Sequence, residues 1–315
     1  MSEGAQFREL IFIRPILKEK MWGGTRISEF GIAFSSSHVG ECWAVSAHPC
    51  GDCTAVSSQL REQKLSELWK NHHELFGAEK SGPFPLMVKI IDAAQDLSLQ
   101  VHPDDEYAGI HENGSLGKTE CWYVLDAKKD ASLIIGHNAS SKDEARKLIE
   151  EKKWAEFIRE VPVRKGDFFF IEPGTVHAIK NGILVLETQQ SSDVTYRLYD
   201  YDRLCDGKPR ELHIQQSLDV ISAPFKDCAP PMLGLETVNR SLKKLAGCTF
   251  FTVWKADICG AETVVQDQNY MIVTVIEGSG FADEQKIAKG SSFIIPSAYG
   301  SVRFSGTMQL IISSS

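Results

Sequence analysis

The sequence lacks several features that would place it in whole classes of protein. No apolar run approaches the ~18–20 residues of a membrane-spanning helix. No basic run is longer than two residues, and the net charge is -8, so nucleic-acid binding is not expected. The N-terminal segment is acidic and short of apolar residues, unlike a signal peptide. We therefore expect a cytoplasmic protein with neither a membrane nor a nucleic acid as partner.

Cysteines are present but form no recognisable framework. The eight cysteines are scattered, and without a secretory signal the simplest expectation is reduced thiols. Cys50 and Cys53 have C-x-x-C spacing, but a structural zinc site needs a second such pair, which is absent. A redox motif needs a helix to open at this point, whereas TAVSS follows. We expect a plain loop there.

Most of the remaining sequence alternates as β-strands do. The segments are short, rich in β-branched and aromatic residues, and bounded by Gly, Pro, Asp or Asn. Many short strands at such spacing predict a β-sandwich or barrel. The strand-like segments are LIFIRPIL, ECWAVSAH, PLMVKIID, SLQVH, CWYVLDA, SLIIGH, DFFFIE and ILVLETQQ.

Two segments have helical periodicity instead. In residues 64–76 the apolar residues recur at i, i+3 and i+4, and Gly77 supplies a stop signal. Residues 140–158 begin with Ser141-x-x-Glu144, which is a capping box. This second helical segment lies between two groups of strands, so we interpret about 138–160 as an insertion.

The C-terminal third repeats the pattern of the region before it. Residues 219–248 contain prolines and lose the alternation, which suggests a linker, and a second set of strands follows. Residues 289–300 echo 165–177 in a glycine turn, an apolar strand and a proline, with Tyr299 or its neighbours in place of His177. Since no histidine follows His213, we interpret this as a duplication whose second copy carries no metal. Coincidental hairpin chemistry is the alternative.

Four side chains form a candidate metal site: Gln100, His102, Glu120 and His177. Gln100 and His102 are two apart and share one face of a strand, and Glu120 lies in the next strand. Two imidazoles, a carboxylate and an amide oxygen suit a borderline divalent cation such as zinc. The alternatives are a turn histidine at 102, a surface glutamine at 100, and an ion pair of Glu120 with Lys118.

The motifs that surround these residues resemble one known family, the short bacterial form of type I mannose-6-phosphate isomerase, in the cupin superfamily. The resemblance covers about residues 10–315. It is carried by KEKMWGG (18–24), GECWAVSAHP (40–49), QVHPDD (100–105), LGKTECWY (116–123), ETQQSSDVTYRLYDYDR (187–203) and RELH (210–213).

The resemblance implies a mainly β fold of two cupin (jelly-roll) β-barrels with a small helical insertion. Residues 1–220 would form the catalytic metal-binding domain and 221–315 a second, metal-free cupin-like domain. The implied enzyme interconverts mannose 6-phosphate and fructose 6-phosphate through a metal-stabilised cis-enediolate. It would use one Zn²⁺ per chain and act on a small sugar phosphate as a monomer or homodimer. The family's metal ligands fall on Gln100, His102, Glu120 and His177.

Several cationic side chains are candidates for catalysis or for binding an anionic substrate. The family's active-site arginine falls on Arg197, where a charged edge strand is the alternative interpretation of residues 196–203. Lys118 is a candidate for the general base or for a substrate contact, and a solvated strand lysine is its alternative. Arg203 is a candidate for substrate binding, as is Arg210. One departure is visible: Glu172 stands where relatives usually have proline, in the turn before His177.

Two other functions fit parts of the pattern. Two histidines and a carboxylate also suit iron(II), so a cupin dioxygenase is one alternative. A non-catalytic sugar-binding cupin is the other.

Overall fold

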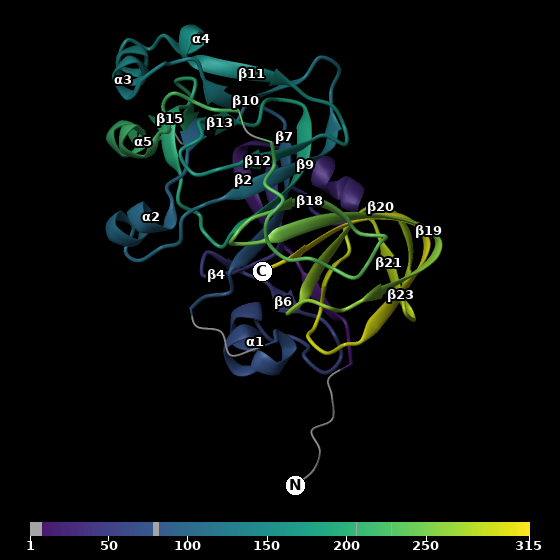
Figure 1. Ribbon diagram of the computed structural model, residues 1–315. Coiled ribbons are helices and arrows are strands. Elements are labelled where there is room, and N and C mark those ends of the chain that lie inside the picture. Colours follow the sequence, from purple (N-terminus) through teal and green to yellow (C-terminus); the bar gives the residue numbers. More distant parts are fainter. Residues whose placement is uncertain (1–7, 78–81, 206, 228) are drawn as a thin grey trace.

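The computed structural model describes residues 8–77, 82–205, 207–227 and 229–315. Three large β-sheets form successive layers, with helices at the periphery (Figure 1). The fold is mainly β, as the sequence predicted, and all the segments predicted as strands contribute strands.

The central layer is a six-stranded antiparallel sheet. Its inner strands are buried on both faces, and their side chains alternate between two cores. In β7, Val88 and Ile90 face the eight-stranded C-terminal sheet, while Ile91 and Ala93 face the five-stranded sheet. In order, the strands are β12 (Phe168–Ile171), β9 (Glu120–Ala127), β14 (Ile183–Gln190), β7 (Leu86–Ala93), β3 (Val39–Val45) and β2 (Ile16–Gly24).

A five-stranded sheet supplies the other wall of the candidate site. Its order is β11 (Ile158–Pro162), β10 (Ser132–His137), β13 (His177–Ala178), β8 (Leu99–Val101) and β15 (Tyr196–Tyr199). Two short hairpins complete this part of the chain: β4 (Ala47–His48) with β5 (Gly51–Asp52), and β16 (Leu204–Cys205) with β17 (Lys208–Pro209).

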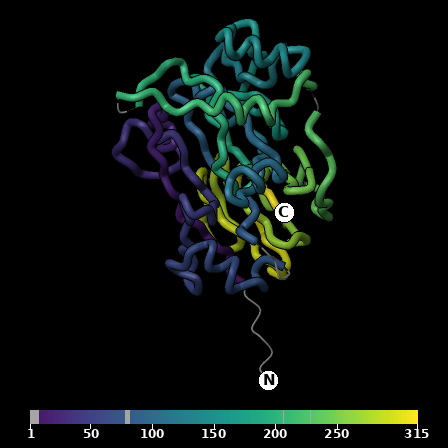
Figure 2. The backbone as a smooth tube through the Cα atoms, turned by 90° about the vertical axis from the view of Figure 1, so that its left-hand side faces the viewer, coloured from purple at the N-terminus to yellow at the C-terminus, as the bar shows by residue number. Residues whose placement is uncertain are grey.

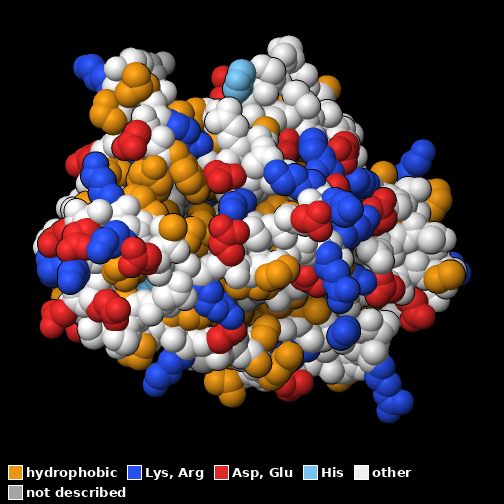
Figure 3. All heavy atoms as spheres, turned by 90° about the horizontal axis from the view of Figure 1, so that it is seen from above, with side chains coloured by type: hydrophobic (Ala, Val, Ile, Leu, Met, Phe, Trp, Pro, Cys, Tyr) orange, Lys and Arg blue, Asp and Glu red, His pale blue; other side chains and the backbone are white. Residues whose placement is uncertain are grey.

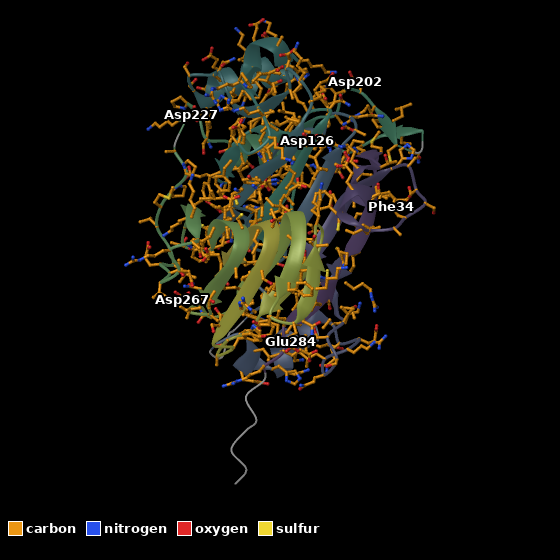
Figure 4. The ribbon with its side chains drawn as sticks, turned by 90° about the vertical axis from the view of Figure 1, so that its right-hand side faces the viewer. Phe34, Asp126, Asp202, Asp227, Asp267 and Glu284 are labelled. Carbon is orange, nitrogen blue, oxygen red and sulfur yellow. The ribbon has the colours of Figure 1, made fainter. Side chains whose placement is uncertain are left out.

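The third layer is an eight-stranded sheet of long C-terminal strands, which faces the viewer in Figure 4. It includes two strands from the N-terminal region, and its interior has a core of its own. The order is β18 (Lys243–Gly247), β19 (Thr252–Val265), β23 (Ser301–Ser314), β20 (Met271–Ala282), β22 (Ser292–Ile295), β1 (Ile11–Arg14) and β6 (Thr54–Ala55), and β21 (Gln285–Ala288) pairs with β20.

The duplication expected from the sequence has a counterpart in topology. The orders β12–β9–β14–β7 and β22–β20–β23–β19 correspond strand for strand. The two glycine turns also make the same bond: Gly166 N–H donates to the Val124 carbonyl (2.9 Å), and Gly290 N–H donates to the Val275 carbonyl (2.8 Å).

The entry of β1 into the C-terminal sheet was not foreseen. The segment predicted as one strand, 10–17, is interrupted at Pro15, which has no N–H with which to continue the ladder. Before Pro15 the chain pairs with β22, and after it with β3. The segment predicted as a linker is largely irregular, but it begins in the last turn of α5 and ends in β18.

The helices occupy the predicted segments and a few more. Residues 64–76 form α1 (Leu65–Asn71) and a 3-10 turn (His73–Leu75), and residues 140–158 form α3 (Lys142–Glu150) and α4 (Trp154–Phe157). Half of the predicted capping box is present: Ser141 Oγ accepts from Glu144 N, but the Glu144 carboxylate binds Ser140 instead. The others are α2 (Asp105–His111), α5 (Ile214–Val220) and a 3-10 turn (Arg26–Phe30).

Helices α3, α4 and α5 cover the outer face of the five-stranded sheet (Figure 1).

The view from above shows acidic and basic side chains interspersed over the surface (Figure 3). Within the described ranges, no helix has the length and apolar character that crossing a membrane requires. Free thiols are present at Cys42, Cys50, Cys53, Cys121, Cys248 and Cys259. Cys228 lies outside the described residues.

An aromatic cluster joins the α1 region to the C-terminal sheet, and its loss should destabilise the protein strongly. Trp69, Phe76, Phe84 and Tyr270 are buried, with ring centroids 5.2–6.3 Å apart. We expect Phe76→Ala to lower the free energy of unfolding by about 3–5 kcal/mol, because it leaves a cavity between packed rings. Urea denaturation would measure it. The control Phe281→Ala, at a side chain 46% exposed, should change stability by no more than about 0.5 kcal/mol. If both variants lost the same free energy of unfolding, the aromatic cluster would not be a main source of stability.

Candidate metal centre and cavity

The five-stranded sheet brings three predicted site residues side by side. Gln100 in β8 lies directly opposite His177 in β13 and Arg197 in β15. Residues directly opposite each other in antiparallel strands project from the same face. The face that carries all three turns toward the six-stranded sheet, where Glu120 begins β9.

His102, Glu120 and His177 converge between the two sheets and are all buried. The Nε2 atom of His102 lies 3.5 Å from Glu120 Oε2, and that of His177 lies 3.4 Å from Glu120 Oε1. The two imidazole centroids are 4.7 Å apart. With Gln100, these residues form what we call the central cluster.

Backbone carbonyls fix the orientation of both imidazoles. His102 Nδ1 lies 2.9 Å from the Val194 carbonyl oxygen, and His177 Nδ1 lies 2.9 Å from that of Thr175. Each Nδ1 therefore donates its proton outward, and the lone pair of each Nε2 points inward. Burial lowers the pKa of His177 to about 4 and that of His102 well below its ordinary value, so both rings are neutral at pH 7.

Glu120 and Lys118 lie together at the edge of this cluster. Among the described residues, neither Glu120 oxygen accepts a directed hydrogen bond, although the Lys118 ammonium lies 3.0 Å from Oε2. Burial raises the pKa of the Glu120 carboxyl. For Lys118, burial acts to lower the pKa, but the carboxylates of Glu120 and Glu187 outweigh it and hold the pKa above the ordinary lysine value.

Gln100 is placed to add a fourth donor. Its amide contacts Nε2 of His177 at 3.2 Å through the nitrogen. A half-turn of the amide puts the carbonyl oxygen at the same place.

The central cluster fits a resident divalent cation. Two inward lone pairs, a carboxylate without a directed hydrogen bond and an amide oxygen form an N/O donor set that zinc accepts. The carbonyls behind the histidines are the partners that metal-bound imidazoles usually have. Gln100, His102, Glu120 and His177 would hold the ion.

Beside the cluster opens a cavity of about 380 Å³, which includes Gln100 and Lys118 in its wall. Its basic side chains outnumber its acidic ones. The basic residues are Lys18, Lys20, Lys89, Lys118, Arg197 and Arg210, and the acidic ones are Glu41, Glu187 and Asp193. The chain is acidic overall, but this cavity is suited to an anionic ligand.

One row of residues on the six-stranded sheet was not predicted from the sequence. Trp122, Glu187, Lys89 and Trp43 lie directly opposite one another across β9, β14, β7 and β3. Glu187 accepts from Trp122 Nε1 at 3.0 Å and pairs with Lys89 Nζ at 3.2 Å. A lysine and a glutamate in strands buried on both faces were the signal that could have found them.

The three predicted arginines have different surroundings. Arg197 lines the cavity, and its buried Nε has no hydrogen-bond partner among the described residues. Arg210 also lines the cavity, where Asp200 binds its Nε at 2.7 Å. Arg203 is not in the cavity wall; its guanidinium binds Asp200 and the Asp96 carbonyl, and it contributes to holding Asp200 beside Arg210.

The departure at Glu172 leaves the turn before His177 intact. Glu172 is exposed, and its carbonyl accepts from Thr175 N–H at 3.1 Å. Gly174 adopts φ 82°, and its N–H donates to the His102 carbonyl at 2.9 Å. A side chain at residue 174 would also collide with Ser222, which explains why glycine is required there.

Comparison with known proteins agrees with this architecture. Residues 10–123 match the family described as "Phosphomannose isomerase type I, catalytic domain", and residues 241–315 match "Mannose-6-phosphate isomerase, cupin domain". A Bacillus subtilis relative, mannose-6-phosphate isomerase ManA, is 44% identical over 97% of this chain and 98% of its own length. The chain belongs to the type I mannose-6-phosphate isomerase family.

Other members of the family extend the likeness over the whole chain. The mannose-6-phosphate isomerase of Streptococcus mutans is 43% identical over 98% of both chains. The crystal structure of the Bacillus subtilis enzyme superposes with a TM-score of 0.92 at 42% identity, covering 97% of this chain and 99% of that one. The cupin fold and the family resemblance are thereby confirmed.

Proposed function

We propose that this protein interconverts mannose 6-phosphate and fructose 6-phosphate with one Zn²⁺ at the central cluster. The observation that carries the proposal is a buried His–Glu–His donor set in contact with Gln100 and Lys118, which line a predominantly basic cavity. Family membership supports the choice of substrate, since the matched relatives are named for this reaction.

The chemistry requires a proton to move between C2 and C1 of the sugar through a cis-enediolate. A bound divalent cation supplies positive charge for the oxygens on C1 and C2 as negative charge develops there. The Lys118 side chain contacts the central cluster and lines the cavity; as a neutral amine it would take the proton from one carbon and, as the resulting ammonium, return it to the other. Burial keeps the two histidines neutral, and neighbouring backbone carbonyls fix their orientation.

Cationic side chains would bind the phosphorylated sugar away from the reacting carbons. Arg197 and Arg210 lie on the same side of the cavity wall, and Asp200 anchors Arg210. Guanidinium groups bind phosphate and hydroxyl oxygens with directed pairs of hydrogen bonds. Arg203 remains a candidate for substrate binding only through Asp200.

The direct test is a coupled assay that follows fructose 6-phosphate formed from mannose 6-phosphate. The purified protein should be active with stoichiometric zinc, and should consume no oxygen. Absence of isomerase activity in zinc-loaded protein would refute the proposal, and sugar-dependent oxygen consumption would favour a dioxygenase.

Removal of the Arg197 side chain should weaken use of the substrate. A hydrogen bond to a charged group contributes roughly 1.5–3 kcal/mol, so we expect Arg197→Ala to lower kcat/KM by about 10- to 100-fold. Steady-state kinetics on mannose 6-phosphate would measure this change. Arg164→Ala, at a side chain 89% exposed and outside the cavity, is the control and should retain full activity. An unchanged kcat/KM in Arg197→Ala would remove Arg197 from the site.

The proposal includes three further predictions. The protein works in the cytoplasm, it does so as a monomer or homodimer, and its catalytic and cupin-like domains divide at residues 220 and 221. Strands β1 and β6 would then extend from the catalytic domain into the sheet of the second domain.

A further inference from the structure

A second group of metal-type ligands lies at the edge of the same cavity. His48, Cys50 and Asp193 bring an imidazole nitrogen, a thiol sulfur and a carboxylate oxygen within 4.8 Å of one another. We call these three residues the mouth site. Cys50 and Asp193 line the cavity, and all three are at least partly accessible to solvent.

Local structure holds the three side chains together. The β4–β5 hairpin pairs His48 with Gly51, so its two-residue turn presents His48 and Cys50 on one side of the molecule. The His48 ring packs edge-on to Trp43, with centroids 6.1 Å apart, and its Nε2 lies 3.4 Å from Asp193 Oδ1. Asp193 therefore meets the hairpin from the loop between β14 and β15.

We propose that His48, Cys50 and Asp193 form a second cation site, which takes a thiophilic divalent ion such as Zn²⁺ or Co²⁺ and whose occupation obstructs the cavity. The donor set of imidazole, thiolate and carboxylate is one that zinc accepts and that magnesium or calcium disfavours. Three protein ligands leave a coordination position for water or for an anionic ligand.

Cation binding at the mouth site changes the protonation of both Cys50 and His48. The neighbouring Asp193 carboxylate raises the pKa of the Cys50 thiol, whose proton a bound cation would displace to solvent. The Cys50 N–H donates to His48 Nδ1 at 3.2 Å, so the neutral ring carries its proton on Nε2. When a cation binds at Nε2, this proton moves to Nδ1 and the hydrogen bond from the Cys50 N–H to Nδ1 is lost. The Cys50 N–H lies in an exposed turn.

The position of the mouth site explains the expected effect on activity. The residue after Asp193 is Val194, whose carbonyl orients His102 in the central cluster. The Lys18 ammonium binds the Cys50 carbonyl and lies 4.8 Å from the Trp43 ring. An ion at the mouth site would thus occupy the approach to the central cluster and compete with substrate.

Cobalt spectroscopy distinguishes the two sites without any isomerase assay. The central cluster offers only nitrogen and oxygen donors, so a sulfur-to-cobalt charge-transfer band in the near ultraviolet reports a bound thiolate. Titration of zinc-loaded protein with Co²⁺ should produce this band in the wild type. It should be lost in Cys50→Ser and kept in Cys259→Ser, which changes an exposed cysteine of β19 far along the sequence.

Binding and inhibition should change together in these variants. Excess Zn²⁺, but not Mg²⁺, should raise the apparent KM of the wild type, and Cys50→Ser should require at least about tenfold more Zn²⁺ for the same effect. A band that is absent from the wild type or that survives in Cys50→Ser would overturn the site. If the band depended on Cys50 but excess Zn²⁺ did not inhibit the enzyme, the proposed obstruction of the cavity would be wrong. Neither outcome depends on the proposed role of the central cluster.

Discussion

Removal of the bound cation with a chelator is expected to lower turnover of mannose 6-phosphate by about 10³-fold or more. A Lewis acid supplies several kcal/mol to an enolisation of this kind, and each ~1.4 kcal/mol corresponds to a factor of ten in rate. The fold gathers the inward lone pairs of His102 and His177 around the Glu120 carboxylate, with the Lys118 ammonium beside them. Dialysis against chelator, followed by the coupled assay and zinc re-addition, measures the effect.

A buried histidine outside the cluster provides a matched control. His137 in β10 is buried, binds the Ser222 carbonyl through Nε2 and stacks on Phe157. His137→Gln should keep its zinc when the metal content is measured, whereas His177→Gln should lose most of it. Undiminished turnover in protein shown to be free of metal would contradict the metal-dependent mechanism.

Local patterns in the sequence were sufficient for the elements, and they selected side chains that the fold brings together. Short apolar runs rich in β-branched and aromatic residues located the inner strands, because these strands are buried against a core on each face. The i, i+2 spacing of Gln100 and His102 placed both on one side of β8 and its extension. The family motifs extended this local prediction to Glu120 and His177, which lie in other strands.

Long-range pairing could not be predicted from these patterns. Nothing within residues 8–20 indicates that β1 pairs with β22, because alternation specifies which face is buried but not which strand is adjacent. Figure 2 shows how far apart in the chain the adjoining segments are: purple N-terminal and yellow C-terminal segments lie side by side, as the β1–β22 pairing requires.

The same limitation applies to the cavity wall. Lys89 and Glu187 are nearly a hundred residues apart, and their ion pair depends on the register between β7 and β14. Arg203 and Arg210 are equally plausible phosphate ligands by sequence, yet Asp200 and the Asp96 carbonyl take up the guanidinium of Arg203. Charge type was predictable for both arginines, whereas access to the cavity was decided by tertiary contacts.

Replacement of Lys118 should have the next largest effect, and it tests how the proton moves. Lys118 Nζ lies 3.1 Å from His102 Nε2 and lines the cavity, which places it between the central cluster and the proposed substrate site. General acid–base groups contribute typically 10²- to 10⁴-fold, so we expect Lys118→Met to lower kcat by about this factor. Steady-state kinetics would measure it, with metal analysis to establish that zinc is retained.

Isotope exchange separates a proton-transfer role from a structural one. If Lys118 carries the proton, fructose 6-phosphate formed in D₂O contains deuterium at C1, and Lys118→Met slows this incorporation as much as it slows turnover. Lys286→Met, at an exposed position of β21, should change neither rate.

Lys89 is the informative comparison, because it also lines the cavity but is paired with Glu187 rather than with a residue of the central cluster. Both variants remove one cationic side chain from the cavity. If Lys89→Met lost the deuterium incorporation and Lys118→Met kept it, Lys89 rather than Lys118 would carry the proton.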